Sequence, residues 1–509
     1  MTSNYEIIRE GNIREYGEGT RHLSFLGRLY TDRTHFIFEL LQNAEDARAT
    51  RIRFELSGDK LEVRHDGRLF DERDVRGICG IDERTKADDL TQIGKFGIGF
   101  KSVYAFTRNP EVHSGDEHFR IENFVRPYHA APKEPGDPWT TLFVFPFDIP
   151  ELEPAVCHDE IAARLRILSA RTLLFLRNLV EIEYVVDDSS GGTYLREVID
   201  RGPARQVTVI GQNFGHEEYE TWLAFGRPVA VPDYDDFVSV EIAFRIEQSQ
   251  GEQAERIIKV DDSPLVVYFP TEKPTRFGFL VQGPYQTTPS RDNVPKSSSW
   301  NTTLVEETAV LITNVLGHLK EMGFLTVGSL LALPIRVEDF PKDGMFLPIA
   351  TAVRAALRNQ ELLPADDGTY VSARHARLAR GADLRRLLSS DLLTSLLKAQ
   401  ENLKWLSGEI THDRAQTRDL HGYLLNHIGV NEIDPEAFAK NLSEDFLAGR
   451  DDDWFARFYE FLLEQESLWR KPKYVGQTRG VLRSRPIIRL DDDTLVVPFD
   501  STERPTAYL

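Results

Sequence analysis

The stretch between residues 39 and 102 contains three short blocks in a fixed order: ELLQNAEDA (39–47), HDG (65–67) and IGKFGIGFKS (93–102). The first block falls on a predicted helix, the second follows a predicted strand, and the third is rich in glycine. Carboxylates, an amide and a glycine-rich loop are the parts that a site for a magnesium-bound nucleoside triphosphate requires. The three blocks therefore predict an ATP site, and a hydrolytic one.

The first block predicts the catalytic and metal-binding side of this site. Apolar residues recur at helical spacing over residues 33–48, which places Glu39, Asn43 and Asp46 along one edge of the helix. The amide oxygen of Asn43 suits Mg²⁺, and Glu39, one turn earlier, can orient and deprotonate an attacking water. Taken alone, this segment is equally compatible with a surface helix whose polar residues are solvated.

The second block predicts the end of the site that recognises the base. Alternating apolar residues predict a hairpin over residues 52–66, and Asp66 comes at its end. A carboxylate there can accept a hydrogen bond from the exocyclic amine of adenine and would leave guanine unpaired. An Asp-Gly pair by itself is most often only a turn.

The third block predicts a cradle for phosphates. Gly94, Gly97 and Gly99 allow a close approach of the backbone, and a helix starting near Phe100 would direct free N–H groups at the phosphates. The block fits neither the GxxxxGK[ST] nor the GxGxxG pattern, which excludes Walker and Rossmann sites. The candidate phosphate contacts, each of which can also be simply solvated, are Lys86, Lys95 and Lys101.

Together the blocks resemble those of the GHKL ATPase superfamily, which includes gyrase B, the ninety-kilodalton heat-shock chaperone, sensor histidine kinases and MutL. ELLQNAEDA is similar to the N box of this superfamily, HDG to its first glycine box and IGKFGIGFKS to its second. The first and third blocks look most like the sacsin-type branch. The resemblance implies an α/β fold for the N-terminal domain, a Bergerat-type sandwich with helices on a mixed, mostly antiparallel sheet.

The resemblance also implies a role for each matching residue. Glu39 is the general base, Asn43 the Mg²⁺ ligand and Asp66 the adenine reader, which Thr141 supports through water. Residues 71–91 are expected to form a lid over ATP. The other nucleotide-binding positions are Asp46, Ala47, Gly67, Lys86, Gly94, Lys95, Phe96, Gly97, Ile98, Gly99, Phe100 and Lys101.

Two departures from the superfamily pattern affect this assignment. HDGRLF (65–70) lacks the second glycine of DxGxG, which leaves the hinging of the lid open, and Thr140 replaces the glycine of a Gly-Thr pair. Histidine kinases typically lack a carboxylate at the position of Glu39, because they pass the phosphoryl group to histidine and not to water. Hydrolysis is therefore favoured over kinase activity.

A loop further along the chain, QTTPSRDN at 286–293, resembles the middle-domain loop that brings an arginine to the γ-phosphate. Arg291 would add a charge-assisted hydrogen bond to the transferring phosphoryl group. A structural arginine on a polar loop is the alternative.

The sequence as a whole predicts three domains. They are an ATP-binding domain (1–155), an α/β middle domain (156–324) and a mainly helical region of unknown role (325–509). The chain stops just after a strand-like run, from which we expect it to be a fragment of a longer protein. Individual elements are predicted as a strand at 141–146 and helices at 158–178, 384–397 and 454–463.

Composition narrows the class of protein. The net charge of −20 disfavours nucleic acid as the main ligand, and no apolar run reaches the ~20 residues that a membrane crossing requires. Two cysteines and the lack of a signal-peptide pattern suit the cytoplasm. The histidines show no HxxxH or CxxC companion spacing, which argues against a structural zinc site.

These observations predict an ATP- and Mg²⁺-dependent conformational machine that hydrolyses ATP to reset its shape. The resemblance implies dimerisation through the N-terminal domain and chaperone-like or defence-associated remodelling of an unidentified protein client. Two alternatives stay open: a nucleotide-gated binding scaffold with negligible turnover, and a DNA-processing clamp of the MutL or MORC kind.

Overall fold

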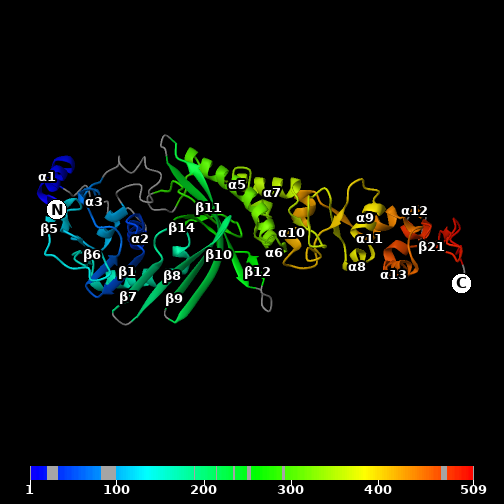
Figure 1. Cartoon of the computed structure of the whole chain (residues 1–509), viewed down its shortest axis with the longest axis horizontal. Helices are drawn as coiled ribbons and strands as arrows, with labels where there is room; N and C mark the ends of the chain where they lie inside the picture. The colour runs from blue at the N-terminus through cyan, green and yellow to red at the C-terminus, as the bar shows by residue number, and fades with distance from the viewer. Residues whose placement is uncertain are drawn as a thin grey trace. The chain divides into compact units, whose positions relative to one another are not determined.

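The computed structural model describes residues 2–19, 32–81, 99–187, 190–213, 215–232, 236–248, 254–288, 293–471 and 479–507. The chain forms two compact units, Met1–Leu311 and Ile312–Leu509, and the division falls inside helix α5 (Ser299–Glu321). Figure 1 shows the course of the chain through both units.

The first unit is built on one 15-stranded sheet in the order β14-β13-β15-β11-β10-β9-β8-β7-β1-β2-β6-β3-β4-β5, with β12 beside β11. Among the described strands, the neighbouring pairs are antiparallel except β1 with β7 and β13 with β15. Figure 1 shows the sheet continuing from β1 into β7, β8, β9 and β10. The strands are β1 (Arg51–Ser57), β2 (Lys60–His65), β3 (Glu111–Ser114), β4 (Glu117–Glu122), β5 (Arg126–His129), β6 (Thr141–Pro146), β7 (Glu181–Val186), β8 (Ser190–Arg201), β9 (Ala204–Asn213), β10 (His216–Ala230), β11 (Phe237–Gln248), β12 (Glu255–Ile258), β13 (Pro264–Val267), β14 (Phe269–Pro274) and β15 (Leu280–Gln282).

Strands β1 and β2 form the hairpin that the alternating pattern predicts. Ser57 pairs with Lys60 across a two-residue turn, and buried residues alternate with half-buried ones along both strands. The predicted strand at 141–146 is confirmed as β6, which pairs with β2.

The sheet has two halves, one made of β1–β6 and the other of β7–β15. They are joined by the parallel pairing of β1 with β7, in which Ile52 lies beside Ile182. A buried carboxylate from helix α2 (Phe36–Asp46) holds the chain that enters β7. Glu45 Oε1 accepts hydrogen bonds from the backbone N–H groups of Arg177 and Asn178 at 2.7 and 2.8 Å, and Oε2 accepts one from Leu179 at 2.9 Å. The helix of the first motif is thereby tied to the second half of the sheet.

The helices of the first unit cover this sheet and complete one apolar core. The predicted helix at 158–178 is wrong in its length, because α4 ends at Arg166. Beyond it, the carbonyl of Leu168 accepts a hydrogen bond from the Tyr194 hydroxyl, and the N–H of Ala170 donates to Glu218 at 3.0 Å. These contacts with β8 and β10 replace the helical ones. The described helices are α1 (Tyr5–Tyr16), η2 (Arg33–His35), α2, α3 (Glu72–Cys79), η3 (Gly99–Ala105), α4 (Pro154–Arg166), η4 (Ala170–Leu173) and α5.

The second unit is mainly helical and has its own apolar core. The predicted amphipathic stretch at 384–397 is two helices, because Ser389 leaves helical geometry and its hydroxyl caps α9. The run of aspartates at 451–453 begins α13, whose first turn donates a hydrogen bond from Trp454 N–H to Asp451 at 2.8 Å. The helices are α6 (Val327–Ala332), η5 (Val337–Asp339), α7 (Leu347–Asn359), α8 (Ala382–Leu387), α9 (Ser390–Leu396), α10 (Arg418–Tyr423), η6 (Leu424–Ile428), α11 (Pro435–Asn441), α12 (Glu444–Leu447), α13 (Asp452–Leu463), η7 (Glu466–Trp469) and η8 (Val481–Ser484).

Short strands complete the second unit. Strand β18 (Ala376–Ala379) lies between β19 (Lys404–Trp405) and β20 (Asn431–Ile433), parallel to both. The two-stranded pairs are β16 (Leu363–Pro364) with β17 (Tyr370–Val371) and β21 (Ile488–Arg489) with β22 (Leu495–Val496).

The predicted fold class is confirmed: a mixed α/β architecture with a large, mostly antiparallel sheet, followed by a mainly helical C-terminal region. The division into three domains at residues 155 and 324 stays a prediction. No described helix combines the length and the apolar composition that crossing a membrane requires.

We expect Glu45→Gln to destabilise the first unit by about 2–4 kcal/mol, because an amide nitrogen would face backbone N–H donors that now bind a buried carboxylate. Urea unfolding measures this loss. Glu183→Gln on β7, which removes only a partly exposed ion pair with Arg53, is the matched control and should cost about 1 kcal/mol or less. Equal losses for the two variants would contradict the structural role of Glu45.

Candidate functional site

The predicted catalytic edge of α2 lies at the border between core and surface. Asp32 caps the preceding turn by accepting a hydrogen bond from Thr34 N–H at 2.8 Å, so the helix starts at Phe36. Glu39 is buried, with 7% of its surface exposed, Asn43 one turn later is half-buried, and Asp46 is exposed. The three polar residues therefore run outward from the core, in the order that the helical spacing predicts.

The carboxylate of Glu39 lies directly against the last glycine of the third block. A Cβ placed on Gly99 would stand 1.9 Å from Glu39 Oε2, so a side chain at position 99 requires the Glu39 carboxylate to move. On the other side, Glu39 Oε1 lies 3.4 Å from His35 Nε2. The structure thus brings the first and third blocks together at one buried carboxylate.

The second block packs against the C-terminal end of α2. A Cβ on Gly67 would lie 2.7 Å from the carbonyl oxygen of Ala47, and that carbonyl accepts a hydrogen bond from Arg68 N–H at 2.9 Å. The hydroxyl of Thr140 donates to the carbonyl of Gly67 at 2.6 Å. Gly67 therefore serves close packing between the HDG turn, α2 and the start of β6.

Asp66 points its carboxylate at strand β1. Oδ1 accepts hydrogen bonds from the N–H groups of Thr50 and Arg51 at 2.7 and 2.9 Å, and Oδ2 accepts one from the Thr50 hydroxyl at 2.5 Å. Burial by itself raises the pKa of Asp66, but these hydrogen bonds outweigh it and hold the pKa below its usual value. The predicted role of Asp66 in reading adenine stays a prediction, and its carboxylate is engaged within the fold.

His65 is the buried polar residue at this strand end, with 2% of its surface exposed, and it lies opposite Thr141 in the sheet. Burial lowers its pKa to about 4, against the pull of the Asp66 charge, so the ring is neutral near pH 7. Its Nδ1 accepts a hydrogen bond from Gly67 N–H at 3.1 Å, which places the ring proton on Nε2. The alternation of buried and half-buried residues along β2 already indicates that His65 faces inward, although the sequence motifs assign it no role.

Thr141 and Lys101 are both fully buried. The Thr141 hydroxyl shares a hydrogen bond of 2.7 Å with Ser114, next to His65. Lys101 Nζ donates to the carbonyl oxygens of Ile78 and Phe124 at 2.6 and 2.5 Å, and burial lowers its pKa to about 8. In this structure the Lys101 amine therefore serves the fold, although the sequence predicts a phosphate contact.

Phe100, another predicted contact, is the second residue of η3 and packs in the core, its ring centroid 6.0 Å from that of Phe143. The remaining predicted site residues lie outside the described part of the chain. They are Lys86, Gly94, Lys95, Phe96, Gly97, Ile98 and Arg291.

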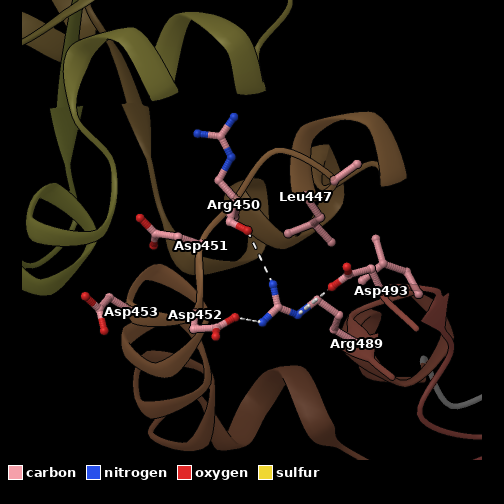
Figure 2. A pocket seen from close by; sticks show the side chains of 9 residues that line it. Leu447, Arg450, Asp451, Asp452, Asp453, Arg489 and Asp493 are labelled. Atoms are coloured by element: carbon pink, nitrogen blue, oxygen red, sulfur yellow. Dashed lines mark hydrogen bonds and ion pairs between the residues drawn. The ribbon is translucent and has the colours of Figure 1, made fainter. Parts of the chain in front are cut away.

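A separate hollow of about 520 Å³ lies in the second unit, where Figure 2 shows Arg489 between Asp452 and Asp493. Arg489 forms ion pairs with both carboxylates and donates to the carbonyl of Arg450 at 3.3 Å. Arg489 is thus paired with two of the carboxylates that line this hollow, and we assign it no ligand.

Comparison with known proteins bears on the region that holds the three blocks. Residues 19–123 match the Sacsin domain. This range contains all three blocks.

Two relatives extend the comparison. The chain is 26% identical to the protein NO VEIN of Arabidopsis thaliana over 451 residues, which cover 82% of this chain and 16% of that protein. It is 32% identical to human sacsin over 130 residues, 22% of this chain and 3% of sacsin. The chain therefore spans only a small part of either relative.

Among solved structures, the crystal structure of the N-terminal domain of a DNA repair protein aligns with 53% of this chain and 90% of its own, at 11% identity. The TM-score of 0.32 is too low to support an inference about function.

We expect Gly99→Ala to destabilise the protein by about 1–2 kcal/mol, because the new methyl group displaces the buried Glu39 carboxylate from its present position. In a Glu39→Ala background the same change should cost much less, and chemical denaturation of the four variants measures this coupling. Gly77→Ala, in α3 with no atom within 4 Å of the new methyl group, is the control and should stabilise the protein by up to about 1 kcal/mol through its higher helix propensity. Additive losses at 39 and 99 would contradict the contact.

For Asp66 we expect Asp66→Ala to lower the free energy of unfolding by about 1–3 kcal/mol, because its hydrogen bonds to Thr50 and Arg51 are lost, and its predicted role as adenine reader further predicts a weaker preference for ATP over GTP. Thr50→Val, which removes only the hydroxyl bound to Asp66, should reproduce part of the loss. Unfolding curves measure the change in stability, and displacement of a fluorescent nucleotide by ATP or GTP measures the preference between them. An unchanged preference for ATP would remove the adenine-reading role, and unchanged stability would contradict the contact with Thr50.

Proposed function

We propose that this chain binds ATP with Mg²⁺ at the site between α2, the HDG turn and Gly99, and hydrolyses it as a conformational machine of the GHKL type. The observation that carries the proposal is the buried Glu39 carboxylate held against the backbone of Gly99. The match of residues 19–123 to the Sacsin domain supports it, since that range contains every part of the site except Thr141 and Arg291.

In the proposed reaction, Glu39 takes a proton from water as the water oxygen attacks the γ-phosphorus of ATP. The bond between that phosphorus and the bridging oxygen breaks, and ADP leaves with the electron pair. Burial beside His35 and Gly99 keeps the carboxylate in a fixed position, which is the main requirement of a general base in phosphoryl transfer. Mg²⁺, bound through Asn43, would neutralise charge on the phosphates.

The proposal includes mechanical output through α2. Phe38 of this helix packs against Phe269 of β14 with ring centroids 5.1 Å apart, and Glu45 holds the entry to β7. A shift of α2 on nucleotide binding would therefore be transmitted to the second half of the sheet. The predicted contact of Arg291 with the γ-phosphate, dimerisation and a protein client all belong to the proposal.

The deciding experiment is steady-state phosphate release by the purified chain with ATP and Mg²⁺. We expect Glu39→Gln to reduce the rate by about 10²–10⁴-fold while nucleotide binding stays within a few-fold, because only the proton acceptor is lost. Glu10→Gln, at an exposed position of α1, is the control and should keep the wild-type rate.

Two outcomes would count against hydrolysis. If the wild-type chain binds ATP but releases no phosphate, the nucleotide-gated scaffold replaces the hydrolase. If Glu39→Gln releases phosphate at the wild-type rate, the carboxylate is not the general base.

A further inference from the structure

Three metal-ligating side chains converge in the second unit, far along the sequence from the three blocks. The ligand atoms of His412, His421 and Glu432 all lie within 4.8 Å of one another. His421 is buried and Glu432 half-buried, each with 9% of its side chain exposed, whereas His412 is exposed. The group is therefore anchored on one side and open to solvent on the other.

The three residues come from three different parts of the chain. His421 lies on α10, which continues into the π-helical turn η6, a widening that is frequent at functional sites. Glu432 lies on β20, in the middle of its pairing with β18. His412 lies on the loop that leads into α10.

The loop that carries His412 is held by its own hydrogen bonds. The Thr417 hydroxyl donates to the carbonyl of Thr411 at 2.9 Å and accepts from Thr411 N–H at 3.3 Å. Arg418 Nε donates to the carbonyl of His412 at 3.1 Å. The backbone at His412 is thus fixed before any ligand binds, and only its side chain needs to move.

Outer partners already orient the candidate ligands. Glu432 Oε2 accepts a hydrogen bond from Arg380, which leaves Oε1 toward His421 Nε2 at 2.9 Å. Asp413 lies 3.0 Å from His412 Nε2, which leaves Nδ1 of that ring for a ligand. Carboxylate and histidine ligands held by a second group in this way are typical of metal sites.

We propose that His412, His421 and Glu432 bind a divalent transition-metal ion, with Zn²⁺ as the expected ion for two imidazoles and one carboxylate. The metal would take the place of the proton now shared between His421 and Glu432. Ligand atoms of a tetrahedral zinc site lie about 3.3 Å apart, so rotation of the exposed His412 side chain would close the site. Three protein ligands leave a fourth position open to water or another ligand.

The proposal does not depend on the proposed ATP site, because it concerns the second unit and a different ligand. The alternative is an ion-pair network of His421, Glu432 and Arg380 that binds no metal. His412 distinguishes the metal site from the ion-pair network, because only the metal site requires its side chain.

The test is titration of the metal-stripped full chain with Co²⁺ and then Zn²⁺. We expect the visible bands of tetrahedral Co²⁺ at one equivalent, their loss on addition of Zn²⁺, and a higher unfolding temperature with Zn²⁺. His412→Ala should weaken Zn²⁺ binding at least tenfold at unchanged apo stability, because its side chain is exposed.

Variants at the other two ligands complete the test. His421→Gln and Glu432→Gln keep a hydrogen-bonding side chain and should lower the affinity by at least tenfold. His375→Ala removes a histidine of the same unit that pairs with Glu401 and has no third ligand nearby among the described residues, so it should bind Zn²⁺ normally. Absence of stoichiometric uptake, or uptake that His412→Ala leaves unchanged, would overturn the proposal.

Discussion

The parallel pairing of β1 with β7 is the constraint on which the first unit depends. This pairing joins strands β1–β6 to strands β7–β15, so that one continuous sheet runs through the whole unit. Glu45 secures this joint with a buried carboxylate bound to three consecutive backbone N–H groups. A charge buried this deeply is tolerated only because its oxygens are satisfied, so loss of the donors would release the joint.

The same helix that secures the joint also carries the candidate catalytic group. Glu39 faces Gly99, and Glu45, less than two turns later, faces the entry to β7. Phe38, the residue just before Glu39, contacts Phe269 on β14. A rigid-body shift of α2 would displace all three side chains together, so these contacts link the position of Glu39 to strands β7 and β14.

Much of the fold follows from local patterns. Alternation predicts the β1–β2 hairpin and β6, and helical spacing predicts α2 and α13, because each pattern matches the period of its element. The prediction for 158–178 is wrong because Tyr194 and Glu218, which lie on strands remote in sequence, bind the backbone at Leu168 and Ala170. Such contacts have no signature in the segment that they reshape.

The sequence by itself determined the order of the blocks, their helix and strand settings and the α/β class, since these depend on local spacing and composition. The tertiary structure decided which way the side chains face. It turned Asp66 toward Thr50, buried Lys101 against two carbonyls and placed His65 inside. It also brought together His412 and its two partners, whose spacing matches no compact motif. The physical reason is that burial and pairing depend on neighbours that only the folded chain supplies.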